Sequence, residues 1–452
     1  MNVASPNASR APLRSALAAF ALLLALCTTT LARADVRCVA SASAFVDAIA
    51  DAIDGAEGST WDIRVRPGTY QLNASVLFIP AGDHDNKLLY VSGGWNSGCS
   101  EQTGHAAGTV IRGIASTQDT VGTQFFFFGN NNRYDFENIR FENFSDFTIG
   151  DPGCAPYNIC PGTAAILVDH AEFNNGERVN ILTYDSPYLA FRNNLVTNMA
   201  PRSGDGPGPA FAPVGIEAYS NAYVDISFNT LARLTCLSAA GGLIIRSANP
   251  NTKLHHNIVQ TTGCSKDVFI ETDYGGRKLT PWSNLLLSIA NYNGNLADQG
   301  NVLAFDPGFV DAFNGNFRLE NDSPAVNAGM TLIDAVLMGF FGPGLDLDGQ
   351  LRPTGLHYDI GAYESAVNDG APAVITVTNT SDDADDVHSL RHAINTANAQ
   401  VGTTQEIRFD IPGGCPQLIL LGDEQPDVTD SLYINGYSQP GSTMNTDVSF
   451  GS

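Results

Sequence analysis

The pattern Phe228-Asn229-Thr230-Leu231 returns as His256-Asn257-Ile258-Val259 and again as Ser283-Asn284-Leu285-Leu286. Related runs occur earlier in the chain, at Asn193-Asn194-Leu195-Val196 and at Glu137-Asn138-Ile139. The last four of these asparagines are separated by 35, 28 and 27 residues, spacings within the range of solenoid repeats. The sequence therefore predicts one solenoid coil for each asparagine.

A second β-rich run precedes each of the last four asparagines, so each coil carries at least two strands. These runs are Val179-Asn180-Ile181-Leu182, Gly215-Ile216-Glu217-Ala218, Gly242-Leu243-Ile244-Ile245 and Val268-Phe269-Ile270-Glu271. The predicted fold is all-β, a right-handed parallel β-helix with β-branched and leucine side chains in its interior. The asparagines are expected at one corner, hydrogen-bonding to the backbone and to each other along the stack, which makes them structural.

The N-terminal part contains a predicted helix, because apolar residues recur at helical spacing from Ser43 to Ile53. The alternating strand Trp61 to Val65 and the turn Pro67-Gly68 follow it. A solenoid needs a cover for its first open coil, so we expect this short helix to be an N-terminal cap.

Residues 1–34 have the features of a secretory signal peptide. Arg10 and Arg14 precede the apolar run Ala16 to Leu26, and Ala32-Arg33-Ala34 provides small residues for cleavage. The mature chain is then expected to begin near Asp35. The apolar run is too short for a permanent transmembrane helix and no later segment is long enough, so the expected location is secreted, extracellular or cell-surface.

The chain is acidic, with 23 Lys and Arg against 47 Asp and Glu and a formal net charge of −24. Such a charge repels phosphate backbones and anionic membranes, so nucleic-acid binding is disfavoured. Two interpretations of the acidity stay open: solubility alone, or a functional use such as cation binding.

Seven cysteines remain once Cys27 leaves with the signal peptide, and the oxidising compartment favours disulfides. Cys236 and Cys264 each follow a repeat asparagine by seven residues, so they are expected one above the other on adjacent coils, within disulfide reach. By elimination, Cys154 is assigned to Cys160 and Cys38 to Cys99, which leaves Cys415 unpaired. No CxxC pair or histidine cluster suggests a metal site.

A series of motifs follows the repeats, and together they resemble the choice-of-anchor Q domain of bacterial surface proteins over residues 298–365. The motifs are Asp306-Pro307-Gly308-Phe309-Val310-Asp311, Gly315-Asn316-Phe317-Arg318-Leu319, Ser323-Pro324-Ala325-Val326-Asn327-Ala328-Gly329, Asp346-Leu347-Asp348-Gly349, Arg352-Pro353 and Asp359-Ile360-Gly361-Ala362-Tyr363-Glu364. The resemblance implies a segment that closes a β-helix before a surface tether. The repeats of residues 35–297 look like the pectate-lyase-type β-helix.

A new unit begins after the linker 366–372. Val374-Ile375-Thr376-Val377 and the run from His388 to Ile394 resemble the CSLREA-type motif that opens another class of bacterial surface β-helices. His388 stands where that motif has cysteine and His392 where it has glutamate. The resemblance implies that residues 373–452 are the start of a second, truncated β-helix.

An outward stripe is the candidate ligand site. Tyr184 and Tyr219 each fall ten residues before their asparagine, and Arg246 and Asp273 fall eleven before theirs, with Glu271 close by. Tyrosine faces and planar polar groups suit sugar recognition, and carboxylates beside a basic residue suit acid–base cleavage. The alternative is an ordinary solvated outer face.

Alternating aspartates suggest one possible cofactor, calcium, because Asp346 and Asp348 precede a glycine and Asp359 follows them. The alternative is that these aspartates make turns inside the closing segment. The histidines form no catalytic constellation, and strand alternation predicts that at most one of His255 and His256 faces outward.

The function expected from these features is that of a secreted or cell-surface β-helix that binds a polysaccharide or another surface polymer. The alternative is a polysaccharide lyase or glycoside hydrolase acting on an acidic, plant or bacterial glycan on the same scaffold, because fold alone does not fix function. The closely set aspartates and Gly-His-Gly of polygalacturonase-like enzymes are absent. Catalytic residues are therefore not assigned from the sequence.

Overall fold

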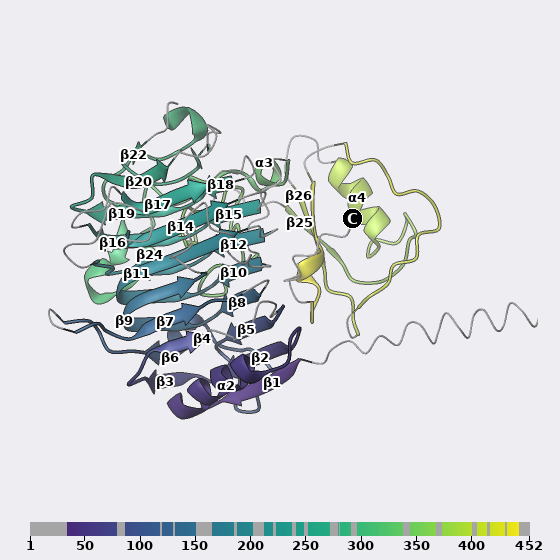
Figure 1. Ribbon diagram of the computed structural model, residues 1–452. Coiled ribbons are helices and arrows are strands. Elements are labelled where there is room, and N and C mark those ends of the chain that lie inside the picture. The colour runs from purple at the N-terminus through teal and green to yellow at the C-terminus, as the bar shows by residue number, and fades with distance from the viewer. Residues whose placement is uncertain are drawn as a thin grey trace, which may run out of the picture.

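The chain folds as a parallel β-helix followed by two smaller units (Figure 1). The computed structural model describes residues 34–78, 86–117, 120–129, 132–150, 165–184, 188–201, 212–219, 223–236, 241–247, 252–271, 279, 281–290, 296–337, 344–367, 373–399, 405–413, 416–429 and 432–442. Within these residues, no helix is long and apolar enough to cross a membrane.

One wall of the β-helix is a nine-stranded sheet in which every neighbouring pair is parallel. Its strands, in spatial order, are β1 (Asp35–Val39), β2 (Thr60–Val65), β5 (Leu88–Ser92), β8 (Arg133–Glu137), β10 (Ala165–Asp169), β12 (Tyr188–Arg192), β15 (Tyr223–Ser227), β18 (Thr252–His255) and β21 (Pro281–Trp282). Because spatial order follows chain order, each strand belongs to the next coil. The first strand starts at the residue expected to begin the mature chain.

The remaining walls form a thirteen-stranded sheet, also paired in parallel. It contains β3 (Gly68–Gln71), β4 (Val76–Phe78), β6 (Thr109–Arg112), β7 (Gln124–Phe127), β9 (Arg140–Ile149), β11 (Glu172–Tyr184), β13 (Leu195–Thr197), β14 (Val214–Tyr219), β16 (Thr230–Thr235), β17 (Gly241–Ser247), β19 (Ile258–Thr262), β20 (Lys266–Glu271) and β22 (Ile289–Ala290). The predicted all-β parallel β-helix is confirmed.

The N-terminal cap is the helix α2 (Ala42–Asp54), one residue longer at each end than the sequence predicted. The side chain of Ser41 accepts a hydrogen bond from the backbone N–H of Ala44, which satisfies a free donor of the first turn. Phe45 and Ile49 are buried in the same apolar cluster as the first coils.

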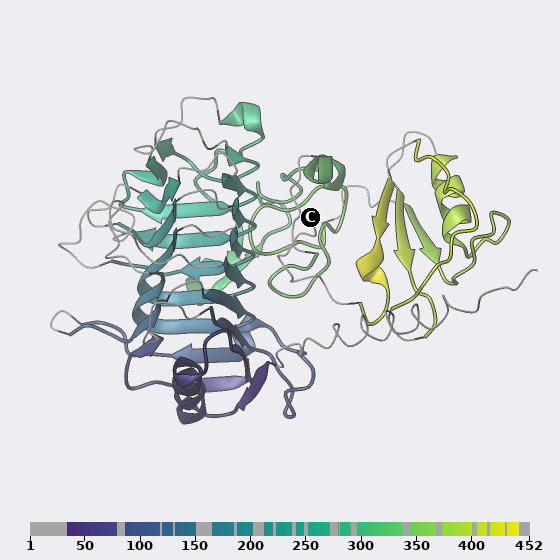
Figure 2. The same cartoon turned by 45° about the vertical axis from the view of Figure 1, so that its right-hand side comes forward.

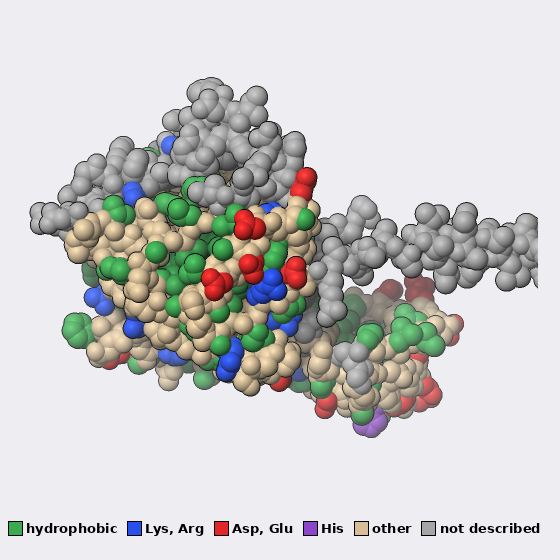
Figure 3. Space-filling model, turned by 60° about the horizontal axis from the view of Figure 1, so that its bottom comes forward, with side chains coloured by type: hydrophobic (Ala, Val, Ile, Leu, Met, Phe, Trp, Pro, Cys, Tyr) green, Lys and Arg blue, Asp and Glu red, His purple; other side chains and the backbone are tan. Residues whose placement is uncertain are grey.

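Seen from the N-terminal end, the surface of the molecule carries acidic and basic side chains gathered among hydrophobic ones (Figure 3).

Phenylalanine rings fill the interior of the N-terminal coils, whereas the sequence predicted β-branched and leucine side chains throughout. Phe127, Phe136 and Phe147 have neighbouring ring centroids 4.7–5.7 Å apart, and Phe173 continues the stack toward Phe191. Leucine, isoleucine and valine take over in the later coils. The prediction therefore holds for the later coils and for the first ones, where Ile63, Val65, Leu89 and Val91 are buried, and it fails where the phenylalanines gather.

The repeat asparagines form a ladder at one corner, as predicted. The side-chain amide nitrogen of Asn194 donates to the side-chain oxygen of Asn229 over 3.0 Å, that of Asn229 to Asn257 over 2.9 Å, and that of Asn257 to Asn284 over 3.0 Å. The sequence analysis missed a fifth member, Asn301, which accepts from Asn284 over 3.0 Å.

Asn138 is not part of this ladder, and its assignment to the repeat was wrong. Arg140 pairs with Glu172, which pairs with Leu195, so the ladder position in that coil is Ile139. Asn138 instead has a left-handed φ of 51°. The same corner position in later coils also has positive φ, at His170, Asn193, Phe228, His256 and Ser283.

Two of the predicted disulfides are present. Cys236 and Cys264 lie on adjacent coils with Cα atoms 4.7 Å apart, and Cys38 joins Cys99 with Cα atoms 5.7 Å apart. The second bond ties β1 to the loop after β5. Cys154, Cys160 and Cys415 lie outside the described residues.

The segment after the coils contains β23 (Phe309–Asp311), β24 (Asn316–Leu319) and α3 (Leu332–Leu337), and it lies against the β-helix (Figure 2). We call this segment, from β23 to residue 367, the closing segment after the resemblance given above. The backbone N–H of Gly361 donates to the carbonyl of His256, and that of Ala362 donates to the Thr230 hydroxyl. Three short 3₁₀ helices, η1 (Ala106–Gly108), η3 (Ala297–Gln299) and η4 (Ala312–Asn314), occur in loops before and within this segment.

The described part of the C-terminal unit is a three-stranded parallel sheet with one α-helix and one short 3₁₀ helix. Its elements are β25 (Ala373–Val377), α4 (Leu390–Asn398), β26 (Gln405–Phe409), β27 (Leu432–Asn435) and η5 (Gly436–Ser438). Val377, Ile394 and Ile407 are buried in a small core of its own. The domain boundaries at 297, 365 and 372 stay predictions.

Candidate functional site

The outer face of the nine-stranded sheet carries two rows of side chains in register. In β8, Tyr134 and Phe136 point into the fully buried core, so Arg133, Asp135 and Glu137 point outward. Strand pairing extends these positions across the sheet. The first row is Asp62, Tyr90, Asp135, Leu167, Ala190, Asp225 and Lys253, and the second row is Arg64, Ser92, Glu137, Asp169, Arg192, Ser227, His255 and Trp282.

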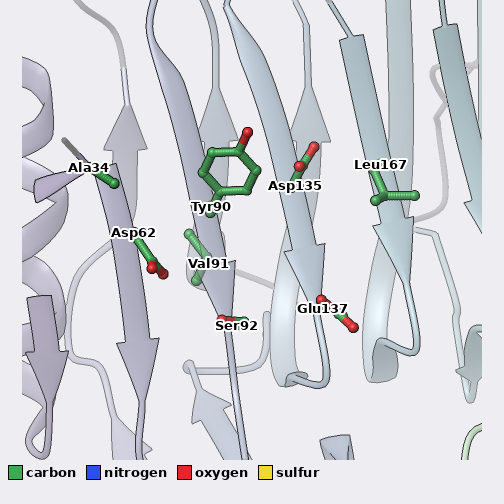
Figure 4. A pocket seen from close by; sticks show the side chains of 8 residues that line it. All are labelled: Ala34, Asp62, Tyr90, Val91, Ser92, Asp135, Glu137 and Leu167. Atoms are coloured by element: carbon green, nitrogen blue, oxygen red, sulfur yellow. The ribbon is translucent and has the colours of Figure 1, made fainter. Parts of the chain in front are cut away.

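A pocket of about 240 Å³ lies on this face over β2, β5, β8 and β10. Asp62, Tyr90, Asp135 and Leu167 stand side by side on successive strands, and Ser92 and Glu137 lie toward the strand ends (Figure 4). Ala34 and Val91 complete the lining. The lining therefore combines three carboxyl groups with one phenol and one hydroxyl, and its described residues include no Lys, Arg or His.

Arginines beside the pocket hold two of its carboxylates in place. Arg64 forms an ion pair with Asp62 at 2.7 Å, and its guanidinium lies 4.2 Å from the ring centroid of Trp95. The Nε of Arg133 lies 3.1 Å from both carboxylate oxygens of Asp135. A guanidinium that is fixed by a ring or a fork of hydrogen bonds orients its carboxylate.

The two acids of β8 have unusual proton affinities. Burial raises the pKa of Asp135 to about 6, although Arg133 acts in the opposite direction. Burial, together with the neighbouring carboxylate of Asp169, raises the pKa of Glu137 to about 7. Glu137 is thus partly protonated near neutral pH.

Asp169, next to Glu137 on β10, is held in its charged form. Arg192 Nε lies 2.8 Å from one of its oxygens, and His170 Nδ1 lies 2.7 Å from the other. Burial would raise the pKa of Asp169, but these two partners outweigh it and hold that pKa well below its usual range. Burial would lower the pKa of His170, but Asp169 and Glu137 outweigh it, so that pKa is raised.

Aromatic rings continue the face beyond the pocket. The rings of Tyr188 and Tyr223 stack in parallel, with centroids 5.6 Å apart and planes 4° apart, and both are half-buried. The Lys253 ammonium lies 5.2 Å from the Tyr223 ring centroid. Burial, with help from Asp225, raises the pKa of Tyr188 to about 12, so both phenols stay protonated at neutral pH and can donate hydrogen bonds.

The stripe predicted from the sequence is partly described. Strand pairing places Glu217, Arg246 and Glu271 in one row, and it pairs Tyr184 with Tyr219. Arg246 lies 2.8 Å from the Glu217 carboxylate. The side chains of Tyr184, Tyr219 and Glu271 lie outside the described part of the structure, as does Asp273, so the stripe stays a prediction.

The aspartates predicted as calcium ligands are engaged by backbone groups or by arginine. One Asp346 oxygen accepts hydrogen bonds from the backbone N–H groups of Asp348 and Gln350. Asp348 pairs with Arg318, and Asp359 accepts from the backbone of Asn327. These contacts are those of the turn-forming alternative, and the calcium site stays a prediction.

The side chains of His255 and His256 both point away from the interior of the coil. The expectation that at most one of them faces outward was therefore wrong. His255 belongs to the second outer row and lies 3.3 Å from Asp225. The left-handed φ of His256 interrupts the alternation, and its Nε2 accepts a hydrogen bond from the backbone N–H of Met330 in the closing segment.

The outer rows were missed by sequence reasoning, although a signal for them existed. Arg192, Ser227, His255 and Trp282 each fall two residues before a ladder asparagine. Each of these residues directly follows the last core-facing residue of its strand, so strand alternation points its side chain outward. Counting back two residues from each asparagine, as the cysteines were located by counting forward seven, would therefore have located this row.

The arrangement offers ion pairs, stacked rings and two acids that titrate near neutrality, all on one face. Such a set of groups can bind hydroxyl-rich polymers and can transfer protons. Among the described residues, no group of three or more His, Cys, Asp and Glu side chains is placed to hold a metal ion. Comparisons with models of protein families, with curated proteins and with solved structures found no match.

Proposed function

We propose that this protein is secreted and binds a polysaccharide, or another linear surface polymer, along the outer face of the nine-stranded sheet. The observation that carries the proposal is the register of the two outer rows. Parallel strands lie about 4.8 Å apart, so the half-buried members of the rows, such as Tyr90, Glu137 and Arg192, present polar and aromatic groups at intervals along the helix axis. A linear polymer with a regular repeat fits such a surface.

The chemistry of the face supports a sugar ligand. The stacked rings of Tyr188 and Tyr223 offer a flat apolar surface of the kind that packs against sugar rings. Carboxylates such as Asp62 accept hydrogen bonds from hydroxyl groups, and phenols donate them. Charges such as Asp169 and Asp225 are buried at this face, and a buried charge is costly unless it is paired. Buried charges with shifted pKa values are typical of sites that serve recognition or catalysis.

Secretion is part of the proposal. It is supported by the leader-like residues 1–34 and by the two disulfides, which persist in oxidising compartments. We assign residues 298–365 to a closing domain that resembles choice-of-anchor Q, and residues 373–452 to a CSLREA-like unit. Both assignments rest on motif resemblance, and they fit a protein held at a cell surface.

The predicted stripe on the thirteen-stranded sheet is a second surface for the same polymer. Its described part, the ion pair of Arg246 with Glu217, offers a charged contact but no described ring. We therefore place the main contacts on the nine-stranded sheet. The two surfaces make different predictions for the same assay.

The test is affinity electrophoresis of the full chain against a panel of neutral and acidic polysaccharides. Tyr223→Ala should weaken binding about tenfold, because one stacked ring contributes on the order of 1–2 kcal/mol. Tyr437→Ala is the matched control, since that tyrosine is exposed in the C-terminal unit, and it should leave binding unchanged. If Arg246→Ala abolishes binding while Tyr223→Ala does not, the polymer lies on the other sheet.

A further inference from the structure

The pocket contains two acids on one strand that face the same side. Asp135 and Glu137 are separated by one residue on β8, so both point to the outer face and both line the cavity. Residues two apart on a strand have Cα atoms about 6.7 Å apart. The two carboxyl groups therefore flank one space over the strand, and enzymes that hydrolyse glycosidic bonds with inversion place a water molecule between two such carboxyl groups.

We propose that this pocket hydrolyses a glycosidic bond of a neutral polysaccharide, with Glu137 as the general acid and Asp135 as the general base. This inference rests on the proposed function, because the polymer must first lie on the outer face. It goes further, because binding alone requires no proton transfer.

Burial and the carboxylate of Asp169 favour the protonated form of Glu137, while His170 and Arg192 act in the opposite direction. Asp169 faces it from β10, with His170 beside that residue and Arg192 on β12, while Asp135 and Arg133 share its own strand. Tyr90 and Ser92 face this strand from β5. Asp169 stays ionised because Arg192 and His170 hold it, so its negative charge disfavours a second one on Glu137. The pKa of Glu137 is about 7 and that of Asp135 is about 6, so both groups exchange protons near neutral pH, as proton transfer requires.

The reaction balances with water as the only co-reactant. Glu137 gives its proton to the glycosidic oxygen as the bond from that oxygen to the anomeric carbon breaks. A water molecule attacks the anomeric carbon from the opposite face and gives its proton to Asp135. Each new chain end carries a hydroxyl group, and the anomeric configuration is inverted. Proton exchange with solvent then restores both acids.

The lining of the pocket selects against anionic sugars. Asp62, Asp135 and Glu137 contribute carboxyl groups, and the described lining contains no basic side chain. Arg64 and Arg133 beside it are already paired with Asp62 and Asp135. Like charges at contact distance repel strongly in a partly buried site. A lyase acts on a uronate and needs positive charge at its carboxylate, so this lining favours hydrolysis of a neutral polymer.

The experiment incubates the full chain with neutral glucans, mannans, xylans and galactans, and with alginate and polygalacturonate. New reducing ends are measured and the anomeric configuration of the fresh product is read by proton NMR. We expect cleavage of at least one neutral polymer, with inversion and a bell-shaped pH profile between about 6 and 7. Glu137→Gln should reduce the rate by a factor of about 100 or more.

Variants separate catalysis from folding and from binding. Glu137→Gln should retain polymer binding in affinity electrophoresis, and Asp135→Asn should lose the rate as well. Glu142→Gln is the matched control, because Glu142 is paired with Arg112 on the other sheet, and it should keep full activity. Circular dichroism checks that each variant is folded.

Several outcomes would overturn the inference. These are wild-type protein that binds a neutral polymer without producing reducing ends, full activity in Glu137→Gln, retention of configuration, or cleavage confined to uronate polymers with unsaturated ends. The first leaves the proposed function standing and removes only the hydrolase. Loss of polymer binding by the wild type would instead remove the proposed function itself.

Discussion

Two polar columns run along the β-helix only two residues apart on each coil. The inner column is the asparagine ladder, and the outer one is the second row of the nine-stranded sheet. Asn229 and Asn257 are fully buried, and Ser227 and His255 in the outer row are nearly as buried. The ladder repeats one residue, whereas the outer row changes residue at every coil.

The two columns differ in how their polar atoms are satisfied. The Asn257 amide nitrogen donates to two backbone carbonyls and to Asn284, and its oxygen accepts from the backbone and side chain of Asn229. In the outer row, Asp169 depends on Arg192 and His170, and the adjacent Glu137 has a strongly raised pKa. Apolar residues would often be at least as stable as such buried charges. The uniform, satisfied column is therefore structural, and the varied, charged one contains the candidate site.

The largest expected effect comes from breaking the ladder. Asn257→Ala removes all the side-chain hydrogen bonds of a fully buried residue and leaves its partners without replacements. Each buried polar group left unsatisfied costs about 1–3 kcal/mol, so we expect a loss of about 3–4 kcal/mol in the free energy of unfolding. Urea unfolding followed by circular dichroism measures it.

A matched control is Asn73→Ala, because Asn73 is exposed, and this change should cost less than about 0.5 kcal/mol. Polymer binding by folded Asn257→Ala should equal that of the wild type, since the ladder lies inside the coil. A stability loss for Asn257→Ala as small as that of the control would contradict a structural ladder.

A smaller effect concerns the contact between the coils and the closing segment. Burial, together with His255 and Arg352, holds the pKa of His256 well below 6.5, and its Nε2 must be unprotonated to accept from Met330. Below pH 6.5, the unfolded chain therefore binds a proton at His256 that the folded chain does not bind. Stability is present above pH 6.5 and is lost as the pH falls below it.

The measurement is the difference in unfolding free energy between pH 7 and pH 5. His256→Gln should remove about 2 kcal/mol of the wild-type pH dependence, because Gln does not titrate. His105→Gln, at an exposed position, should leave the dependence unchanged. If both variants show the same pH dependence of the unfolding free energy as the wild type, the protonation of His256 does not affect the stability of this contact.

The sequence predicted features that depend on local repetition and missed those that depend on non-repeating neighbours. The ladder from Asn194 to Asn284 and the Cys236–Cys264 disulfide follow from equal offsets in successive coils. The sequence analysis missed Asn301 because it lies only 17 residues after Asn284, a separation shorter than one full coil. The phenylalanine core was also missed, because those coils lack the asparagine that marks the register.

The candidate site was the least predictable part. Glu137, Asp169 and Arg192 come from three coils, and only strand pairing shows that they are neighbours. Their pKa shifts depend on burial and on each other, which no linear pattern contains. Tyrosines and carboxylates were expected on an outer face, but the strands that carry the described cluster could not be chosen from spacing alone.

The smallest expected effect tests the adjacent acids directly. The pKa of Glu137 is raised from 4.5 to about 7 in the folded chain, so its contribution to stability is present below pH 4.5 and is lost as the pH rises through 7. Glu137→Gln cannot ionise, so it should match the wild type at pH 4 and exceed its stability at pH 8 by about 1 kcal/mol, a value reduced by the solvent in the pocket. Asp169→Asn should behave oppositely, because the pKa of Asp169 is lowered and its ionised form stabilises the fold at every pH above about 4. Unfolding curves at pH 4, 6 and 8 separate the two variants. If Glu137→Gln and Asp169→Asn lose stability equally at all three values, Glu137 is an ordinary ionised carboxylate, and the distinction between the ladder and the outer row loses its electrostatic basis.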